Sequence, residues 1–527
     1  MTQPQKTAYE ELKTRFALIS NLGGGASVLS KDAQVFMSPG SKYDRSQQMQ
    51  ANATACHDYI TDPRVGVWLD KAEADQASLS QGDRRNLFLM RSIWTESNSM
   101  SQSLAQECAR INSEGEVLHT ELKPTGDWSK MRDWYAHTFE IAKQVGEAKR
   151  NAVAGFASTY EALLDSYSRG MRDATIAREF GELEQALPAL IKEAQAKQAL
   201  EPAPLPLAGP FPAEQQAELC RRMVKAVGFD FTRGRFDMSP SHPSAGGTAD
   251  DARITAKPGG DDFLSALFAA IHETGHANYN QNTPAEWRYQ PAGSDLGMGV
   301  HESQSRIVEV QACHTPEFFQ FLEKQVREVF NRPNDPALSA QNLERLVNRV
   351  EPSFIRIEAD EITYPAHVIL RYKLEKALVE GTMTIDELPK AWNDGMQQLL
   401  GITPSDPSHG HMQDVHWPTG AIGYFPAYTI GDMGAAQLFV AACKAKPDLR
   451  AELANGNFKP LNEWLKENVH SKGSLLTPEQ LFLNATGEDL NAQHYLNHLS
   501  MRYLGKPYLQ TPNAPAPAAN MGGKPQP

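Results

Sequence analysis

One short segment carries the residue types of a metal-dependent hydrolase. Residues 263–281 read FLSALFAAIHETGHANYNQ, in which His272, Glu273 and His276 form the pattern HExxH. Four residues of an α-helix turn through about 400°, so the two imidazoles lie one turn apart on the same face and can bind one ion. Glu273 lies about 100° further round, where a carboxylate can act as a general base without ligating the metal.

A third protein ligand is expected, because a catalytic zinc site usually takes three and leaves one position open. In the metzincin pattern the third ligand is a histidine six residues after the second, with a glycine midway. Those positions hold Asn282 and Tyr279 here, which excludes that class. A glutamate from a later helix is the alternative, and Glu302 follows His276 after a stretch long enough for a loop and a returning helix.

The neighbours of Glu302 are expected to support it. Glu302, Arg306 and Glu309 are spaced to share one helix face, so we expect Arg306 to pair with Glu309 or with a ligand. His301 points about 100° away from Glu302 and is expected beside the ligands and not among them.

The elements that must position these residues are helices. Apolar residues recur at three- and four-residue spacing over residues 8–200, with 135–164 and 176–187 as examples. Pro188 is expected to end or kink the second of these segments. Only residues 252–255 read as a short strand. The sequence therefore predicts a mainly α-helical fold with very little β-structure.

A proline-rich break divides the chain near its middle. It separates an N-terminal helical part, about 1–200, from the part with HExxH, about 213–508, and contains Pro202, Pro204, Pro206, Pro210 and Pro212. Between a domain linker and an ordered loop within one fold, the loop is favoured. We expect a single-core unit over residues 1–510, followed by a disordered Pro/Ala-rich tail at 511–527.

Composition and charge exclude several classes of protein. Hydrophobic residues make up 41% of the chain, which excludes disorder throughout, and a net charge of −13 without basic runs argues against nucleic-acid binding. No apolar stretch approaches the length of a membrane helix, and the start lacks a secretory pattern. The five cysteines are scattered and odd in number, which is typical of reduced thiols. We expect a cytoplasmic protein without a membrane partner.

Six motifs in register carry a resemblance to a known family. They are His242-Pro243, DARIT at 251–255, HETGH at 272–276, HESQSR at 301–306, IRIEAD at 355–360 and GHMQDVHW at 410–417. Together they resemble the thermostable carboxypeptidase Taq family of metallocarboxypeptidases, over about residues 8–508. Ser244 departs from the family pattern, which has phenylalanine after His-Pro.

The resemblance implies a helical, saddle-like fold with a deep central cleft, usually a homodimer. It implies an enzyme that removes single residues with broad preference from peptides that have a free C-terminal carboxylate. It also implies zinc, for which cobalt often substitutes. His272, His276 and Glu302 would then be the metal ligands, and Glu273 the general base and acid.

A carboxypeptidase must also recognise the free carboxylate of its substrate. An arginine suits this task, because its guanidinium can bind both carboxylate oxygens. Arg356, Arg253 and Arg371 are the candidates. Each can instead form a structural ion pair, and for Arg253 a pair with Asp251 is the favoured interpretation.

His416 and Tyr424 are candidate donors to the oxyanion that develops during hydrolysis. They lie on one Gly-flanked segment, and both side chains can donate a hydrogen bond. Each can instead be a buried side chain with local partners. Asp414 is placed to orient a histidine, whereas Trp417 and Tyr428 are expected in the core.

Two other functions share part of this pattern. An endo-acting metallo-oligopeptidase would use the same zinc chemistry without a carboxylate anchor. A non-catalytic peptide-binding protein could hold a structural metal. Glu273 argues against the second, because a structural site needs no base and is usually closed by a fourth ligand.

Overall fold

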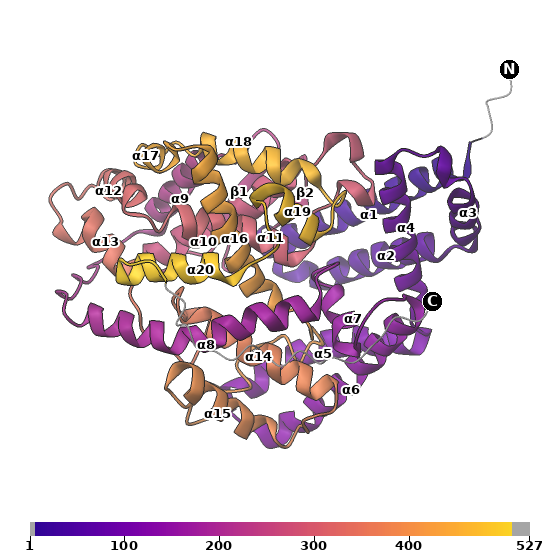
Figure 1. Ribbon diagram of the computed structural model, residues 1–527, viewed down its shortest axis with the longest axis horizontal. Coiled ribbons are helices and arrows are strands. Elements are labelled where there is room, and N and C mark those ends of the chain that lie inside the picture. The colour runs from indigo at the N-terminus through magenta and orange to yellow at the C-terminus, as the bar shows by residue number, and fades with distance from the viewer. Residues whose placement is uncertain (1–5, 509–527) are drawn as a thin grey trace.

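The computed structural model describes residues 6–508, and the predicted tail at 511–527 lies outside them. Within the described residues, helices account for nearly all regular structure and three short strands for the rest (Figure 1). The prediction of a mainly α-helical fold is therefore confirmed. No helix in this part of the chain is long and apolar enough to cross a membrane.

The first part of the chain is entirely helical. Its helices are α1 (Ala8–Val35), α2 (Lys42–Thr61), α3 (Pro63–Ala74), α4 (Gln81–Ser99), α5 (Gln102–Leu122), α6 (Trp128–Ala152), α7 (Thr159–Asp165) and α8 (Asp173–Gln198). A capping box starts α1: the Thr7 side chain accepts from the Glu10 N–H, and the Glu10 carboxylate accepts from the Thr7 N–H.

The second part contains the strands and the HExxH helix. Its first elements are α9 (Ala213–Val227), β1 (Gly234–Met238), β2 (Ser244–Thr248), β3 (Asp251–Ala256), α10 (Phe263–Gln281) and α11 (Met298–Arg306). The later helices are α12 (Pro316–Val329), α13 (Ala340–Val347), α14 (Tyr364–Val379), α15 (Leu388–Leu400), α16 (Pro426–Ala445), α17 (Leu449–Leu453), α18 (Lys459–Asn468), α19 (Pro478–Thr486) and α20 (Ala492–Leu499).

The three strands form one small sheet in the order β1-β3-β2. β1 pairs with β3 in parallel, and β2 pairs with β3 antiparallel in the register Gly246↔Arg253. β3 contains the predicted strand at 252–255. β1 and β2 were not predicted, because β2 (SAGGT) has no large apolar residue and the alternation in β1 is limited to Phe236 and Met238. Ile254 of β3 is buried with Ala266 and Ala270 of α10, so the sheet supports the HExxH helix.

Two segments differ in part from the helix prediction. Pro188 does not end its helix, since α8 continues to Gln198, so the alternative of a kink stays a prediction. The buried Leu187, Leu190 and Ile191 hold that helix in the core on both sides of the proline. The predicted segment 135–164 is broken between α6 and α7, where Gly155 has a φ of 103°.

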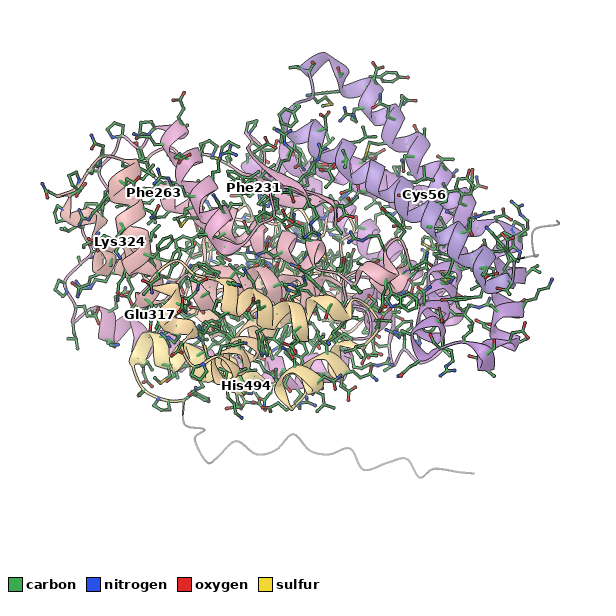
Figure 2. The ribbon with its side chains drawn as sticks, turned by 90° about the horizontal axis from the view of Figure 1, so that it is seen from above. Cys56, Phe231, Phe263, Glu317, Lys324 and His494 are labelled. Atoms are coloured by element: carbon green, nitrogen blue, oxygen red, sulfur yellow. The ribbon has the colours of Figure 1, made fainter. Side chains whose placement is uncertain are left out.

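One large core cluster joins the helices before and after the proline-rich segment. Phe180 of α8 packs edge-on against Tyr372 of α14, with ring centroids 5.4 Å apart. A smaller cluster joins α1, α3 and α4. Figure 2 shows Cys56 of α2 at the opposite end of the molecule from Phe263 and Lys324. α10, α11 and α16 lie between these two ends (Figure 1). The division into two parts at the prolines stays a prediction.

Candidate active site

Three side chains on α10 and α11 come together in the middle of the protein. Nε2 of His272 lies 3.1 Å from Nε2 of His276, and a Glu302 carboxylate oxygen lies 3.7 Å and 3.3 Å from these two nitrogens. Ligand atoms about 2.0–2.2 Å from a tetrahedral zinc lie about 3.3–3.5 Å apart, so this arrangement fits one ion. Among residues 6–508, these three are the group of ligand-type side chains close enough to share a metal.

Two glycines allow the helices that carry these ligands to approach closely. A Cβ on Gly275 of α10 would lie 2.4 Å from the carbonyl oxygen of Gln304. On α16, a Cβ on Gly431 would lie 2.5 Å from Cγ of Glu302. α11 is therefore held between α10 and α16 by close contacts at these two glycines, which fix Glu302 relative to the two histidines.

A chain of charged side chains lies behind His272. Its Nδ1 lies 2.9 Å from a carboxylate oxygen of Glu309, which also accepts from Arg306 at 2.7 Å. Arg306 donates in turn to Asp432 of α16 at 2.6 Å. The predicted Arg306–Glu309 pair is confirmed, and the carboxylate orients the ring so that Nε2 faces the metal position. Glu309 belongs to η6 (Ile307–Ala312), a π-helical continuation of α11.

His301 supports the second histidine in the same way. Nδ1 of His276 lies 2.5 Å from Nδ1 of His301, and Nε2 of His301 lies 3.1 Å from Oδ1 of Asn280. If Nδ1 of His276 donates, its Nε2 is left unprotonated, as ligation requires. His301 thus lies beside the ligands, as the sequence indicated.

Glu273 is buried next to the two histidines, and burial raises the pKa of its carboxyl to about 7. The ammonium of Lys31, which comes from α1, lowers this pKa.

Lys31 is itself buried and donates to Ser244 of β2 at 2.5 Å. Ser244 also donates to Gln34, at 2.8 Å, so the residue that departs from the family pattern joins β2 to α1.

Arg356 and Arg371 converge on one carboxylate. Arg356 donates to Asp414 at 2.9 Å and to the hydroxyl of Tyr364 at 2.8 Å, while Arg371 donates to Asp414 at 2.6 Å. Asp414 therefore pairs with two arginines and does not orient a histidine. The side chain of Arg371 is fully buried, which removes it as a substrate anchor. The guanidinium of Arg306 lies over the same Tyr364 ring as that of Arg356, which links this cluster to the metal ligands.

His416 and Tyr424 lie side by side, with ring centroids 5.5 Å apart. Burial lowers the pKa of His416 to about 3 and raises that of Tyr424 above its usual range, so the first is neutral and the second keeps its proton. The charge of the Glu302 carboxylate also raises the pKa of Tyr424. Tyr428, expected in the core, is only partly buried and its hydroxyl lies 3.1 Å from Nε2 of His416.

Arg253 forms the ion pair that was favoured for it. Its guanidinium donates to Asp251 at 3.0 Å and 2.9 Å, and its side chain is 22% exposed. No contact of Arg253 with the metal-ligand residues is present in the described part of the chain.

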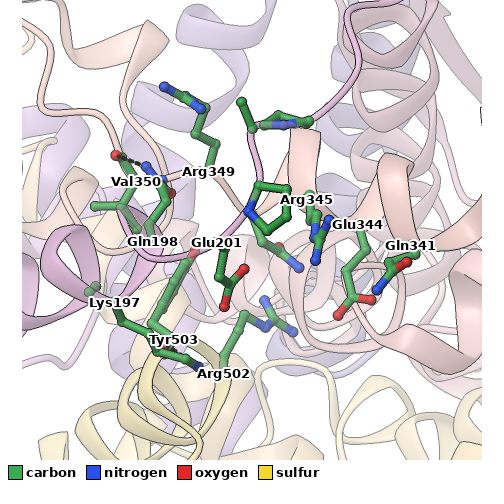
Figure 3. A pocket seen from close by; sticks show the side chains of 15 residues that line it. Lys197, Gln198, Glu201, Gln341, Glu344, Arg345, Arg349, Val350, Arg502 and Tyr503 are labelled. Carbon is green, nitrogen blue, oxygen red and sulfur yellow. Dashed lines mark hydrogen bonds between the residues drawn. The ribbon is translucent and has the colours of Figure 1, made fainter. Parts of the chain in front are cut away.

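Two pockets differ in their relation to this site. One of about 720 Å³ lies where α1, β2 and the end of α10 meet, and Asn280, the partner of His301, lines it. Another, of about 450 Å³, lies between α8, α13 and the segment after α20, and is lined by Lys197, Arg345 and Arg502 (Figure 3). The second shares no residue with the metal-ligand group.

A sequence model of the family described as carboxypeptidase Taq (M32) metallopeptidase matches residues 11–503. The chain belongs to this family. Thermostable carboxypeptidase 1 of Thermus thermophilus is 34% identical over 94% of this chain and 97% of that protein. Carboxypeptidase 1 of Bacillus subtilis is 31% identical over 92% and 96%.

Solved structures agree with the family assignment. Trypanosoma cruzi metallocarboxypeptidase 1 superposes with a TM-score of 0.91 at 33% identity, over 94% of this chain and 99% of that one. The M32 carboxypeptidase of Deinococcus radiodurans R1 gives a TM-score of 0.89 at 31% identity, over the same shares. This M32 protein is therefore a metallocarboxypeptidase, a peptide hydrolase that acts with a divalent metal.

Sequence reasoning missed several residues around the M32 site. The role of Glu309 as the partner of His272 could have been predicted, because Glu309 lies two helical turns after Glu302. Lys31, Asp432 and Tyr428 come from distant or unremarkable positions, and nothing local in the sequence marks them.

Proposed function

We propose that the protein is a zinc-dependent carboxypeptidase that releases single amino acids from peptide C-termini with broad specificity. The observation that carries this proposal is the cluster of His272, His276 and Glu302 with Glu273 buried beside it. Membership of the M32 family supplies the type of substrate.

The proposed ligands are Nε2 of His272, Nε2 of His276 and a carboxylate oxygen of Glu302. A set of two imidazoles and one carboxylate suits zinc and leaves one position open for catalysis, and cobalt is expected to substitute. When bound, such an ion would polarise the scissile carbonyl and acidify a water molecule. Glu309 and His301 would keep the two imidazoles in the ligating orientation.

Glu273 is the proposed general base and acid. Its carboxylate accepts a proton from the attacking water as the oxygen–carbon bond forms, and it delivers that proton to the departing amine as the carbon–nitrogen bond breaks. Its position one residue after His272, on a neighbouring face of α10, supports this role without making it a ligand.

Tyr424 and His416 are the proposed donors to the developing oxyanion. Tyr424 can donate its hydroxyl hydrogen, and the neutral imidazole of His416 can donate one N–H. Both side chains are neutral, so each can donate its hydrogen bond to the oxygen without a change in its own protonation state.

Arg356 is the proposed anchor for the C-terminal carboxylate. Its side chain is 7% exposed; Nε and Nη2 both lie 2.9 Å from Asp414 and Nη1 donates to Tyr364, which leaves one N–H on each of Nη1 and Nη2 for a substrate. Arg253 is the second proposed substrate-binding residue. Its bidentate pair with Asp251 means that a peptide carboxylate would have to compete with that partner.

A peptide time course tests the proposal. The metal-loaded protein is mixed with a ten-residue peptide that has a free C-terminus and with its amidated twin, and products are followed by mass spectrometry. We expect loss of one residue at a time from the free peptide only. Internal cuts in both peptides would establish an endopeptidase, and no cleavage by metal-replete protein would favour the binding-protein alternative.

A cytoplasmic location and a homodimeric assembly are also proposed. The five cysteines are free thiols, which fits the reducing conditions of a cytoplasm. A homodimer is proposed from the family resemblance alone. Light scattering coupled to size exclusion tests it, and a mass near the 58.2 kDa of one chain would contradict it.

A further inference from the structure

A buried carboxylate lies beneath the segment that carries His416 and Tyr424. Glu375 of α14 is fully buried, and no ion pair of it is present among residues 6–508. Instead it accepts three hydrogen bonds: from Nε1 of Trp417 at 2.8 Å, from the Gly423 N–H at 3.1 Å and from the Tyr160 hydroxyl at 2.9 Å.

Two of these donors are next to the proposed oxyanion donors. Trp417 directly follows His416, and Gly423 directly precedes Tyr424. One carboxylate therefore holds both ends of the segment 416–424. Gly423 has a φ of 94°, and a Cβ there would lie 2.9 Å from the backbone nitrogen of Leu164, so this backbone leaves little room to shift.

The same helix also holds the chain just before this segment. Arg371 lies one turn before Glu375 on α14, is also fully buried, and pairs with Asp414 at 2.6 Å. A carboxyl group without a counter-ion is costly to bury in its ionised form, and the three donors that converge on Glu375 reduce this cost. An apolar side chain could fill the same space. Packing alone therefore does not explain why three hydrogen-bond donors converge on this carboxyl group.

We infer that Glu375 is a positioning residue, which sets His416 and Tyr424 at the distance from the metal ligands that oxyanion stabilisation requires. This inference rests on the proposed function of those two donors. Glu375 itself touches no substrate, and it acts through the indole of Trp417 and the backbone of Gly423. Displacement of a catalytic group by about 1 Å can lower a rate about 100-fold.

Glu375→Gln tests the inference because it keeps the side-chain volume. An amide has one acceptor oxygen, so either the Trp417 N–H or the Gly423 N–H faces an NH₂ group instead of an oxygen. We expect kcat to fall about 10- to 100-fold, with KM within about twofold and metal content unchanged. Tyr160→Phe is the matched control, since it removes the one bond that does not reach the segment, and its kcat should stay near that of the wild type.

A double-mutant cycle separates positioning from general destabilisation. If Glu375 acts through Tyr424, Glu375→Gln should lower kcat much less in a Tyr424→Phe background than in the wild type. Full additivity of the two losses would overturn the inference, as would equal kcat in Glu375→Gln and Tyr160→Phe.

Hydrogen exchange gives a readout that does not depend on activity. Amides of residues 416–424 should exchange faster in Glu375→Gln than in Tyr160→Phe, while the exchange rates of α10 amides should be the same in both variants. Equal exchange rates in residues 416–424 would contradict the inference. Absence of C-terminal release by the wild type would instead contradict the proposed function. If Glu375→Gln does not fold, Trp417→Phe removes only one of the three donors and should produce smaller changes of the same kind in kcat and in hydrogen exchange.

Discussion

Nδ1 of His272 lies 2.9 Å from a carboxylate oxygen of Glu309, while Nε2 of the same ring faces Glu302. The carboxylate fixes both the orientation of the ring and the nitrogen that carries the proton. Arg306 holds Glu309 in turn, at 2.7 Å.

Loss of this carboxylate should weaken metal binding. We expect Glu309→Ala to lower the affinity for zinc about 10- to 100-fold, because the ring of His272 is then free to rotate. Competition with a chelator of known affinity measures the change. Glu328→Gln on α12, where the glutamate side chain is 66% exposed, is the control and should bind as the wild type does. Equal affinity in both variants would show that Glu309 does not support the ligand.

A methyl group at Gly275 should separate the helices that carry the ligands. Its carbon would lie 2.4 Å from the carbonyl oxygen of Gln304, so α10 and α11 must move apart. We expect Gly275→Ala to lower the free energy of unfolding by about 1–3 kcal/mol and to reduce the bound metal. Calorimetry and metal analysis measure both.

Gly181 on α8 provides the matched control, because nothing lies within 4 Å of a Cβ placed there. Gly181→Ala should raise stability by about 0.5–1 kcal/mol through helix propensity alone. A Gly275→Ala protein as stable and metal-rich as Gly181→Ala would refute the close-contact explanation.

The HExxH helix and its ligands could be anticipated from sequence, because local periodicity and spacing determine them. α10 has the bounds Phe263–Gln281 of the segment singled out, and the structure brings Glu302 to its two histidines. By contrast, Lys31 and Glu375 reach the site through tertiary packing against residues that are distant in the sequence, which one sequence does not encode locally. The π-helical turn that carries Glu309 has no recognisable sequence signal either.

Removal of the proposed carboxylate anchor should reduce discrimination between free and amidated peptides. Arg356→Gln is expected to lower kcat/KM for the free peptide about 10- to 100-fold, the usual effect of losing a charged hydrogen bond, while any activity on the amidated twin is unchanged. Arg253→Gln is the comparison. A larger loss in Arg253→Gln than in Arg356→Gln would transfer the anchor role to β3.

The ionisation of Glu375 should make stability depend on pH. Burial raises the pKa of its carboxyl to about 7 from an ordinary value of 4.5. The folded protein thus binds this proton more tightly than the unfolded chain does. The resulting stabilisation is complete below pH 4.5 and is lost as the pH rises through 7, a change of about 3 kcal/mol.

Glu375→Gln cannot titrate and should lack this dependence. Denaturant unfolding of both proteins at pH 5, 6, 7 and 8 measures it. We expect the advantage of the wild type over the variant to shrink as the pH rises. A constant difference would mean that the three hydrogen bonds keep the carboxylate ionised throughout.

The role of Glu273 is tested most directly by turnover of Glu273→Gln, with metal content measured on the same sample. The account predicts the metal content of the wild type and a kcat about 10²- to 10⁴-fold lower, because the base is gone while the three ligands remain. Turnover close to that of the wild type would contradict Glu273 as the base, and loss of the metal would make it a ligand instead.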